Sequence, residues 1–163
     1  MANIISQFYT AFSYLDSETM NSFYADDVVF NDPAFGTLKG DEVKYMWQML
    51  CEAQVGKDFK VEFSNVMEDD VSGTAHWEAH YIFSRTGRKV HNKIDAEFKI
   101  TDGKIIEHTD RFNLKKWASQ AMGFKGSIIG GTGYFKRKLQ FRTKKMLGRY
   151  IEKQMTKKIV ETS

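Results

Sequence analysis

The sequence has few of the residues that build cross-linked proteins and no segment that resembles a membrane span. Its 163 residues include one cysteine and one proline. Because Cys51 has no partner, a disulfide framework is excluded, and a buried, unreactive thiol is expected. The first residues, MANIISQFYTAF, lack the basic and apolar regions of a signal peptide, and no window reaches the length of a membrane span. These absences predict a cytoplasmic protein in a reducing setting.

Aromatic residues, by contrast, are abundant. They make up 14% of the chain, and hydrophobic residues make up 42%. This composition favours one folded domain with a substantial core, or a cavity lined by rings. Charge is unevenly spread, since residues 134–163 hold ten Lys or Arg and two Glu, whereas residues 1–133 hold 14 Lys or Arg and 19 Asp or Glu. The sequence therefore predicts a mildly acidic body followed by a basic segment.

The spacing of apolar residues changes along the chain. Helical spacing predicts a first helix from Ile4 to Leu15, and further helices in 17–24 and 41–55 flank a strand in 27–32. From 58 to 113 apolar residues alternate, which predicts strands separated by turns, including a hairpin turn at Asp102-Gly103. A short helix is expected in 114–122, and a basic helix from about 134.

Helices followed by a run of strands indicate an α+β fold, with a curved antiparallel sheet and the N-terminal helices packed on its concave face. Such a sheet leaves an open end where a pocket would lie. We expect a pocket domain in 1–122, a glycine-rich connector in 123–133 and a basic amphipathic helix in 134–163.

Three segments carry a resemblance to a known superfamily. They are YADDVVFNDP with the following Gly36, W-x-A-x-Y in 77–81, and DGKIIEHTDRFNL in 102–114. In order and spacing they resemble the cone-shaped proteins that include nuclear transport factor 2, SnoaL-like polyketide cyclases, ketosteroid isomerase and limonene epoxide hydrolase. The resemblance covers about residues 3–122 and implies the same fold with a ligand pocket.

The resemblance also implies site residues. Asp32 matches the proton-abstracting Asp of the isomerase. However, the two hydrogen-bond donors that the isomerase needs fall on Phe8, with Tyr9 adjacent, and near Ala96. Neither Phe8 nor Ala96 can donate a hydrogen bond from its side chain, so steroid isomerisation is not expected.

Asp110 matches the Asp that performs acid–base work in the hydrolase and the cyclases. The other Asp and the Arg of the hydrolase would fall near Ala79 and Trp77, which cannot replace them. A register slip of one residue would offer neighbouring polar residues, but it would turn Trp77 and Tyr81 outward. The hydrolase set is therefore incomplete.

The last predicted strand combines an acid and a base by its own spacing. A period of two places His108, Asp110 and Phe112 on one face. With Asp102-Gly103 as a two-residue turn, Asp95 is expected opposite Asp110, and Glu97 opposite His108. An acid and a base held together among rings suit proton transfer. We predict that Asp32, Asp110 and His108 are catalytic. We predict that the ligand contacts Tyr9, Trp47, Trp77, Tyr81, Asn92 and Phe112.

Plain structural roles compete with these assignments. Asp32 before Pro33 also fits an Asx-type turn that ends a strand. His108 and Asp110 also fit an ion pair on a strand face, and Trp77 also fits an ordinary core. The histidines lack a convincing metal spacing, so no metal is predicted.

The C-terminal part offers three interpretations. The basic helix could pack on the body or on a partner subunit, lie on an anionic membrane surface, or contact nucleic acid, and its charge opposite to that of the body favours packing. The connector GFKGSIIGGTG lacks the order of a phosphate-binding loop, so it is expected to be a flexible connector or a lid.

Two functions remain open on the sequence. One is a cofactor-independent isomerase, cyclase or hydrolase that moves a proton on a small apolar molecule. The other is a non-catalytic module for ligand binding or protein interaction. In either case we expect a homodimer formed through the sheet, no organic cofactor and no nucleic-acid partner.

Overall fold

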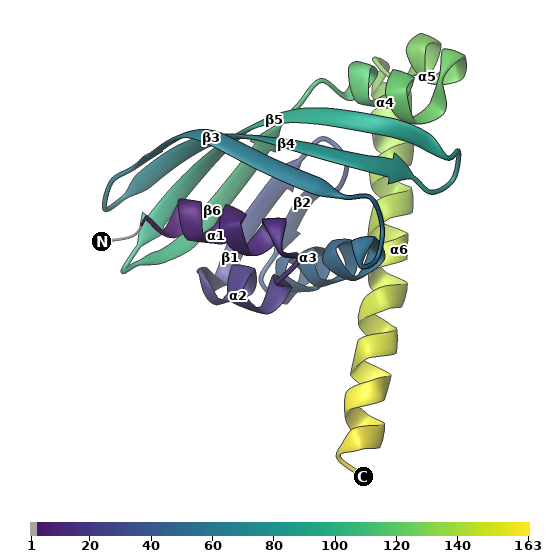
Figure 1. The fold of residues 1–163 in the computed structure, drawn as a ribbon. Coiled ribbons are helices and arrows are strands. Elements are labelled where there is room, and N and C mark those ends of the chain that lie inside the picture. The colour runs from purple at the N-terminus through teal and green to yellow at the C-terminus, as the bar shows by residue number, and fades with distance from the viewer. Residues whose placement is uncertain (1–2) are drawn as a thin grey trace.

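The computed structural model describes residues 3–163 and shows a curved six-stranded sheet with helices against one face (Figure 1). The strand order is β2-β1-β6-β5-β4-β3. The strands are β1 (Tyr24–Asp32), β2 (Gly36–Lys39), β3 (Lys60–Glu68), β4 (Ser72–Phe83), β5 (Arg88–Thr101) and β6 (Lys104–Arg111). The expected α+β fold is confirmed. The sheet is mixed rather than wholly antiparallel, however, because β1 and β6 run parallel to each other.

Three N-terminal helices cover the inner face of the sheet, as predicted. They are α1 (Ile4–Ser13), α2 (Ser17–Ser22) and α3 (Asp41–Gln54). The side chains of Asn3 and Asp16 accept hydrogen bonds from the first turns of α1 and α2, which explains where both helices begin. Their apolar faces pack on the buried residues of the strands, and Cys51 of α3 lies in this core.

Alternation of side chains separates the two faces of the sheet. In β5, Ile94, Ala96 and Phe98 are buried, while Asp95 and Glu97 between them are exposed. Trp77 of β4 also points inward and is 7% exposed, which excludes the alternative register with Trp77 turned outward. We call the face that the three helices cover the inner face, and the opposite one the outer face.

The C-terminal part has more structure than a connector and a helix. The helix α4 (Leu114–Met122) lies where it was expected, capped by Asn113, and a further helix α5 (Phe124–Ile129) occupies much of the expected glycine-rich connector. The long helix α6 (Gly133–Glu161) runs alongside the body and continues past it (Figure 1).

One stripe of α6 packs on the body. Phe135 and Leu147 of this helix are buried, whereas Met146 and Met155 are exposed. The helix α6 therefore packs on the body of its own chain, which is the interpretation that the opposite charges favoured. No helix among residues 3–163 has the length and apolarity required to cross a membrane.

Candidate functional site

An irregularity in the β5–β6 hairpin decides which way His108 and Asp110 point. The tight turn at Asp102-Gly103 forms as predicted, with positive φ at both residues. Between Lys99 and Ile100, however, the register shifts by one residue. The expected pairs Asp95–Asp110 and Glu97–His108 are therefore wrong.

In the observed register, Ala96 lies opposite Asp110 and Phe98 lies opposite His108. Since directly opposite residues share a face, this shift places the acid and the base inside the protein. His108 is 0% exposed and Asp110 is 3% exposed.

A chain of hydrogen bonds ends at Asp110. The indole Nε1 of Trp47 lies 2.8 Å from the hydroxyl of Tyr24, which lies 2.7 Å from Nδ1 of His108. On the other side of the imidazole, Nε2 lies 3.0 Å from Oδ1 of Asp110. The indole Nε1 of Trp77 donates to the same Oδ1 at 3.2 Å. Side chains from four elements, β1, α3, β4 and β6, thus belong to one network of hydrogen bonds that ends at this carboxylate.

The chemistry of the donors fixes the direction of this chain. An indole N–H only donates, so the oxygen of Tyr24 accepts from Trp47 and its own proton must go elsewhere. The partner within reach is Nδ1 of His108, which therefore accepts, and the imidazole proton lies on Nε2 and is donated to Asp110. Both donors reach Oδ1 of Asp110, so Oδ2 is the oxygen available to a ligand.

Aromatic rings enclose the imidazole of His108. The ring centroids of Phe98, Phe30 and Phe8 lie 4.3, 5.1 and 5.7 Å from that of the imidazole. Trp47 stacks on it at 6.0 Å. These contacts lock the orientation of the ring, so His108 holds Asp110 in place and has no route to solvent of its own.

Asp32 forms the Asx-type turn that the sequence offered as one of its two interpretations, and its carboxyl group has a raised pKa. Its Oδ1 accepts hydrogen bonds from the backbone N–H groups of Ala34 and Phe35, at 2.9 and 2.6 Å, which form the Asx-type turn after β1. Burial, with a smaller contribution from the negative charge of Asp110, raises the pKa of Asp32 from 3.8 to about 7, although the backbone hydrogen bonds lower it. The turn therefore holds a carboxyl group that can exchange a proton near neutral pH.

The two carboxyl groups meet at one cleft. Asn31 pairs with Thr109 on the parallel strands β1 and β6, so Asp32 and Asp110, each one residue further along, point to the same side of the sheet. Both line a cleft of about 710 Å³. The remaining lining residues are Asn31, Pro33, Gly36, Thr37, Thr109, Arg111, Phe112, Lys136, Gln140 and Lys144.

The helix α6 forms one wall of this cleft. The side chain of Gln140 donates to the carbonyl oxygen of Pro33 at 3.2 Å, and the hydroxyl of Thr143 donates to that of Ala34 at 2.8 Å. Lys136, Gln140 and Lys144 lie four residues apart, on one side of the helix. The sequence analysis did not identify this wall, although the spacing of four residues between its side chains can be seen in the sequence.

The cleft carries charges of both signs. Two carboxyl groups, Asp32 and Asp110, line it together with the cationic side chains of Lys136 and Lys144, whereas the cation of Arg111 is paired with Glu97. The expected occupant was a small apolar molecule, but this lining is more polar than the expectation implied. The cationic side chains suit a ligand that carries an anionic group.

Tyr9 contributes a hydroxyl without a partner near Asp110. The side chain is 0% exposed, and its hydroxyl is among the buried polar atoms that lack a hydrogen bond in the described chain. Burial raises the pKa of Tyr9, and the charge of Asp110 raises it further. An unpaired buried hydroxyl costs about 1–3 kcal/mol, so this group is a candidate donor to a ligand that reaches Asp110.

The other residues that were predicted to contact the ligand lie in different parts of the structure. Phe112 lines the cleft, as its spacing from Asp110 implied. Trp47 and Trp77 belong to the core and direct their N–H groups into the hydrogen-bond chain rather than toward the cleft. The hydroxyl of Tyr81 accepts from Trp117 of α4, and Asn92 lies half-buried opposite Ala79.

A residue that sequence reasoning missed is Tyr24. It stands at the start of the segment YADDVVFNDP, eight residues before Asp32, and was given no role. No spacing rule relates Tyr24 to His108, because β1 and β6 are far apart in sequence and adjacent only in the sheet.

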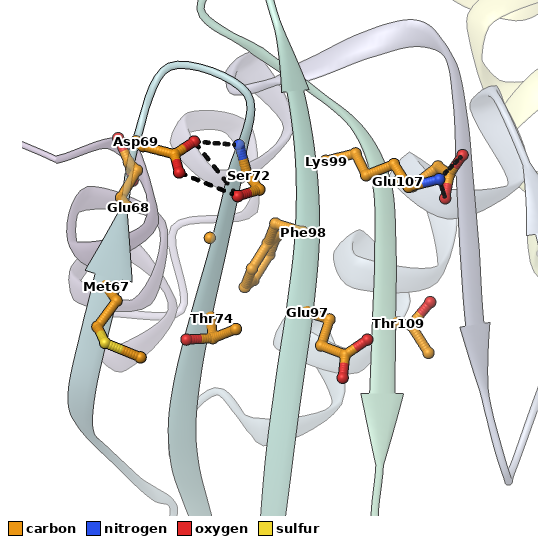
Figure 2. A pocket seen from close by; sticks show the side chains of 11 residues that line it. Met67, Glu68, Asp69, Ser72, Thr74, Glu97, Phe98, Lys99, Glu107 and Thr109 are labelled. Atoms are coloured by element: carbon orange, nitrogen blue, oxygen red, sulfur yellow. Dashed lines mark hydrogen bonds and ion pairs between the residues drawn. The ribbon is translucent and has the colours of Figure 1, made fainter.

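A second hollow, of about 530 Å³, lies over the outer side of β3 to β6 (Figure 2). Its charged groups already have partners: Lys99 pairs with Glu107 at 3.0 Å, and Asp69 accepts hydrogen bonds from Ser72. The carboxylate of Glu68 accepts from the backbone N–H groups at the start of α1. Since these contacts stabilise turns and helix ends, the cleft beside α6 is the better candidate site.

The arrangement in the cleft can move a proton. Asp110 is a fixed carboxylate supported from behind by His108, and Asp32 can be present in both protonation states near neutral pH. The isomerase-like positions remain without donors, because Phe8 and Ala96 are both buried apolar residues of the core. Residues able to ligate a metal ion gather elsewhere, on the outer face.

The model of the SnoaL-like domain matches residues 5–108 of this chain. The match includes Asp32 and His108 and ends two residues before Asp110. A comparison with curated proteins finds no match.

Solved structures of this fold superpose on most of the chain. A candidate polyketide cyclase from Xanthomonas campestris pv. campestris is 19% identical, with a TM-score of 0.57, and the match covers 72% of this chain and 93% of that protein. An epoxide hydrolase from M. tuberculosis, similar to limonene epoxide hydrolase, is 20% identical, with a TM-score of 0.56 and coverage of 78% and 88%.

A protein from Catenulispora acidiphila with a ketosteroid isomerase-like fold, solved with trimethylamine, is 12% identical, with a TM-score of 0.60 and coverage of 74% and 93%. At these identities the likeness establishes the fold, and the chemistry must be argued from the residues of this chain.

Proposed function

Because the chain belongs to the SnoaL-like family, we propose that it binds a small molecule in the cleft beside α6 and transfers a proton on it through Asp110 and Asp32. One observation carries this proposal. Two carboxyl groups from neighbouring parallel strands line the same cleft, and one of them ends a buried chain of hydrogen bonds. This combination supplies an oriented base beside a group able to hold a proton.

The two carboxyl groups take different roles. Asp110 is the positioned base, since Trp77 and His108 hold its Oδ1 and leave Oδ2 for the ligand. Asp32 returns or accepts the proton, because its pKa of about 7 allows both forms at neutral pH. His108 and Tyr24 act as positioning residues, because they touch Asp110 or His108 rather than the cleft.

The charges of the cleft suggest the class of ligand. Lys136 and Lys144 of α6 would hold a carboxylate or another anionic group. Phe112 and Pro33 offer apolar contact to the remainder of the molecule. We therefore expect a mostly apolar small molecule with one acidic group, such as an aromatic or alicyclic acid.

A ligand screen tests this proposal. Thermal shift of the full chain against a library of small aromatic and alicyclic acids would identify binders, and calorimetry would give their affinities. Lys144→Gln should weaken binding of the best acid by about tenfold, the loss of one charge-assisted contact. Lys145→Gln, one residue further on the same helix but outside the lining of the cleft, is the matched control and should bind like the unmodified protein.

Catalysis is tested separately from binding. Turnover of the bound acid, followed by mass spectrometry or by deuterium exchange from solvent, should be lost in Asp110→Asn and reduced in Asp32→Asn, while both variants still bind. If the unmodified protein binds the acid but exchanges no proton on it, the chain is a binding module. The absence of hydrogen-bond donors at Phe8 and Ala96 favours this alternative. Binding of the acid that is unchanged in Lys144→Gln would reject the cleft as the binding site.

Tyr9→Phe separates ligand contact from packing. Removing an unpaired buried hydroxyl should leave the unfolding free energy unchanged or raise it by up to about 1 kcal/mol. The same change should weaken ligand binding if the hydroxyl donates to the ligand.

The homodimer expected from the sequence stays a prediction. Light scattering of the purified chain tests it.

A further inference from the structure

Three side chains that can ligate a metal ion meet on the outer face of the sheet. Glu78 and His80 lie on β4 and His91 lies on β5, and one ligand atom of each lies within 4.8 Å of the others. We propose that Glu78, His80 and His91 form a binding site for a divalent transition-metal ion such as Zn²⁺. This site is separate from the cleft and does not depend on the function proposed for it.

The backbone places these residues together. His80 and His91 are directly opposite each other in the β4–β5 pairing, and their rings stack with centroids 3.9 Å apart. Glu78 lies two residues before His80 and thus on the same face. Because all three side chains stand on paired strands rather than on a loop, the site is positioned before any ion arrives.

A second layer of contacts orients the carboxylate of Glu78. Its Oε2 contacts Nε2 of His91, and its Oε1 lies 3.1 Å from Nε2 of His76. Nδ1 of His76 lies 2.8 Å from Asp95. A ligand that is hydrogen-bonded through its other atom to an outer partner, itself held by a carboxylate, is the arrangement that supports bound metals in proteins.

Distances and access suit a small ion. Ligand atoms about 2.0–2.1 Å from tetrahedral zinc are roughly 3.3 Å apart, so a limited rotation of the side chains would close the present spacing. The side chains of Glu78, His80 and His91 are 24%, 38% and 41% exposed. An ion can therefore enter from solvent, and three protein ligands leave a fourth position for water.

The ligand set and the local charge indicate the class of ion. Two imidazoles with one carboxylate favour Zn²⁺, Ni²⁺, Co²⁺ or Cu²⁺ over Mg²⁺ and Ca²⁺, which prefer oxygen ligands. Glu62, which contacts His80, adds negative charge around the site.

The spacing in the sequence concealed this site. We predicted no metal because the histidines do not follow a spacing typical of metal ligands along the chain. His80 and His91 are brought together by strand pairing across the 83–88 turn, which depends on the register of β4 and β5. Only the register reveals that the two histidines are neighbours.

Metal titration tests the proposal directly. Untagged protein, freed of metal, is titrated with ZnCl2 by calorimetry and with Co²⁺ by visible absorption, where a tetrahedral site gives intense bands. We expect saturable binding in the unmodified chain and its loss in Glu78→Gln, His80→Ala and His91→Ala. Glu97→Gln, which removes an equal charge from the same face, is the matched control and should bind like the unmodified protein.

The outer layer provides a graded test. His76→Ala should weaken Zn²⁺ binding by about 10- to 100-fold without abolishing it, because it removes support and not a ligand. Asp110→Asn, inside the protein, should not change metal binding. The absence of saturable binding, or equal affinity in Glu78→Gln, His80→Ala and the unmodified protein, would overturn the proposal, and circular dichroism of each variant confirms that it is folded.

Discussion

The same kinds of side chain form two networks on the two faces of one sheet, and their surroundings make them different. On the inner face, Tyr24, His108 and Asp110 are at most 3% exposed and are linked in a chain with one direction. On the outer face, the side chains of Glu78 and His91 are 24% and 41% exposed. These two residues belong to a network of histidines and carboxylates.

The comparison shows how burial, rather than residue type, sets the role of a histidine–carboxylate pair. An unpaired polar group in the interior is costly, and each donor of the inner network has an acceptor. Water can replace any contact on the outer face, so each outer contact contributes little to stability but stays open to ions. The inner network therefore positions a carboxylate, while the outer network can bind an ion.

The largest expected difference between the two networks is in stability. His108→Ala leaves Tyr24 without an acceptor and opens a cavity, and it should lower the free energy of unfolding by about 3–5 kcal/mol. His91→Ala, on the outer face, should lower it by less than about 1 kcal/mol. Urea denaturation of both variants measures the two values.

A milder variant keeps this test decisive if His108→Ala does not fold. Tyr24→Phe removes the acceptor of Trp47 and the donor to His108 and should cost about 1–3 kcal/mol. Equal losses in Tyr24→Phe and His91→Ala would contradict the distinction between the faces.

A further effect on stability is expected from pH at the edge of the inner network. The pKa of Asp32 is raised from 3.8 to about 7 in the folded protein. Between these values the folded state holds a proton that the unfolded state has released, so this group makes the protein less stable as pH rises through that interval. The slope cannot exceed about 1.4 kcal/mol per pH unit.

Asp32→Asn should remove this contribution. Unfolding free energies of the variant and the unmodified protein, measured in urea from about pH 4 to about pH 7, should differ by an amount that changes steadily with pH. Curves that stay parallel throughout the interval would show that Asp32 titrates normally.

The smallest effect concerns the outer network. Hydrogen bonds to Asp95, and then to Glu78, raise the pKa of His76 above its ordinary value of 6.5. Asp95→Asn should lower the pKa of His76, which proton NMR of the imidazole in metal-free buffer can follow. A midpoint that does not move would mean that water screens this contact completely.

Much of the fold follows from local patterns in the sequence. Alternation in 94–100 predicted the buried side of β5, and Asn113 predicted the start of α4, because these signals depend on neighbours along the chain. The hairpin at Asp102-Gly103 was predicted for the same reason.

The parts that could not be predicted depend on contacts between distant segments. The register shift in the β5–β6 pairing changes which side chain lies opposite His108, and no local sequence pattern indicates this shift. The parallel pairing of β1 with β6, which brings Asp32 beside Asp110, and the wall formed by Lys136 and Lys144 arise only when the whole chain has folded.

The proximity of the two carboxyl groups can be measured most directly by carbon-13 NMR of the aspartate side chains during a pH titration. In the unmodified protein, the carboxyl carbon of Asp32 should titrate at a pKa of about 7. In Asp110→Asn its midpoint should move down, because the charge that helps to raise it has been removed. A midpoint near 3.8 that does not respond to Asp110→Asn would contradict the shared cleft on which the proposed function rests.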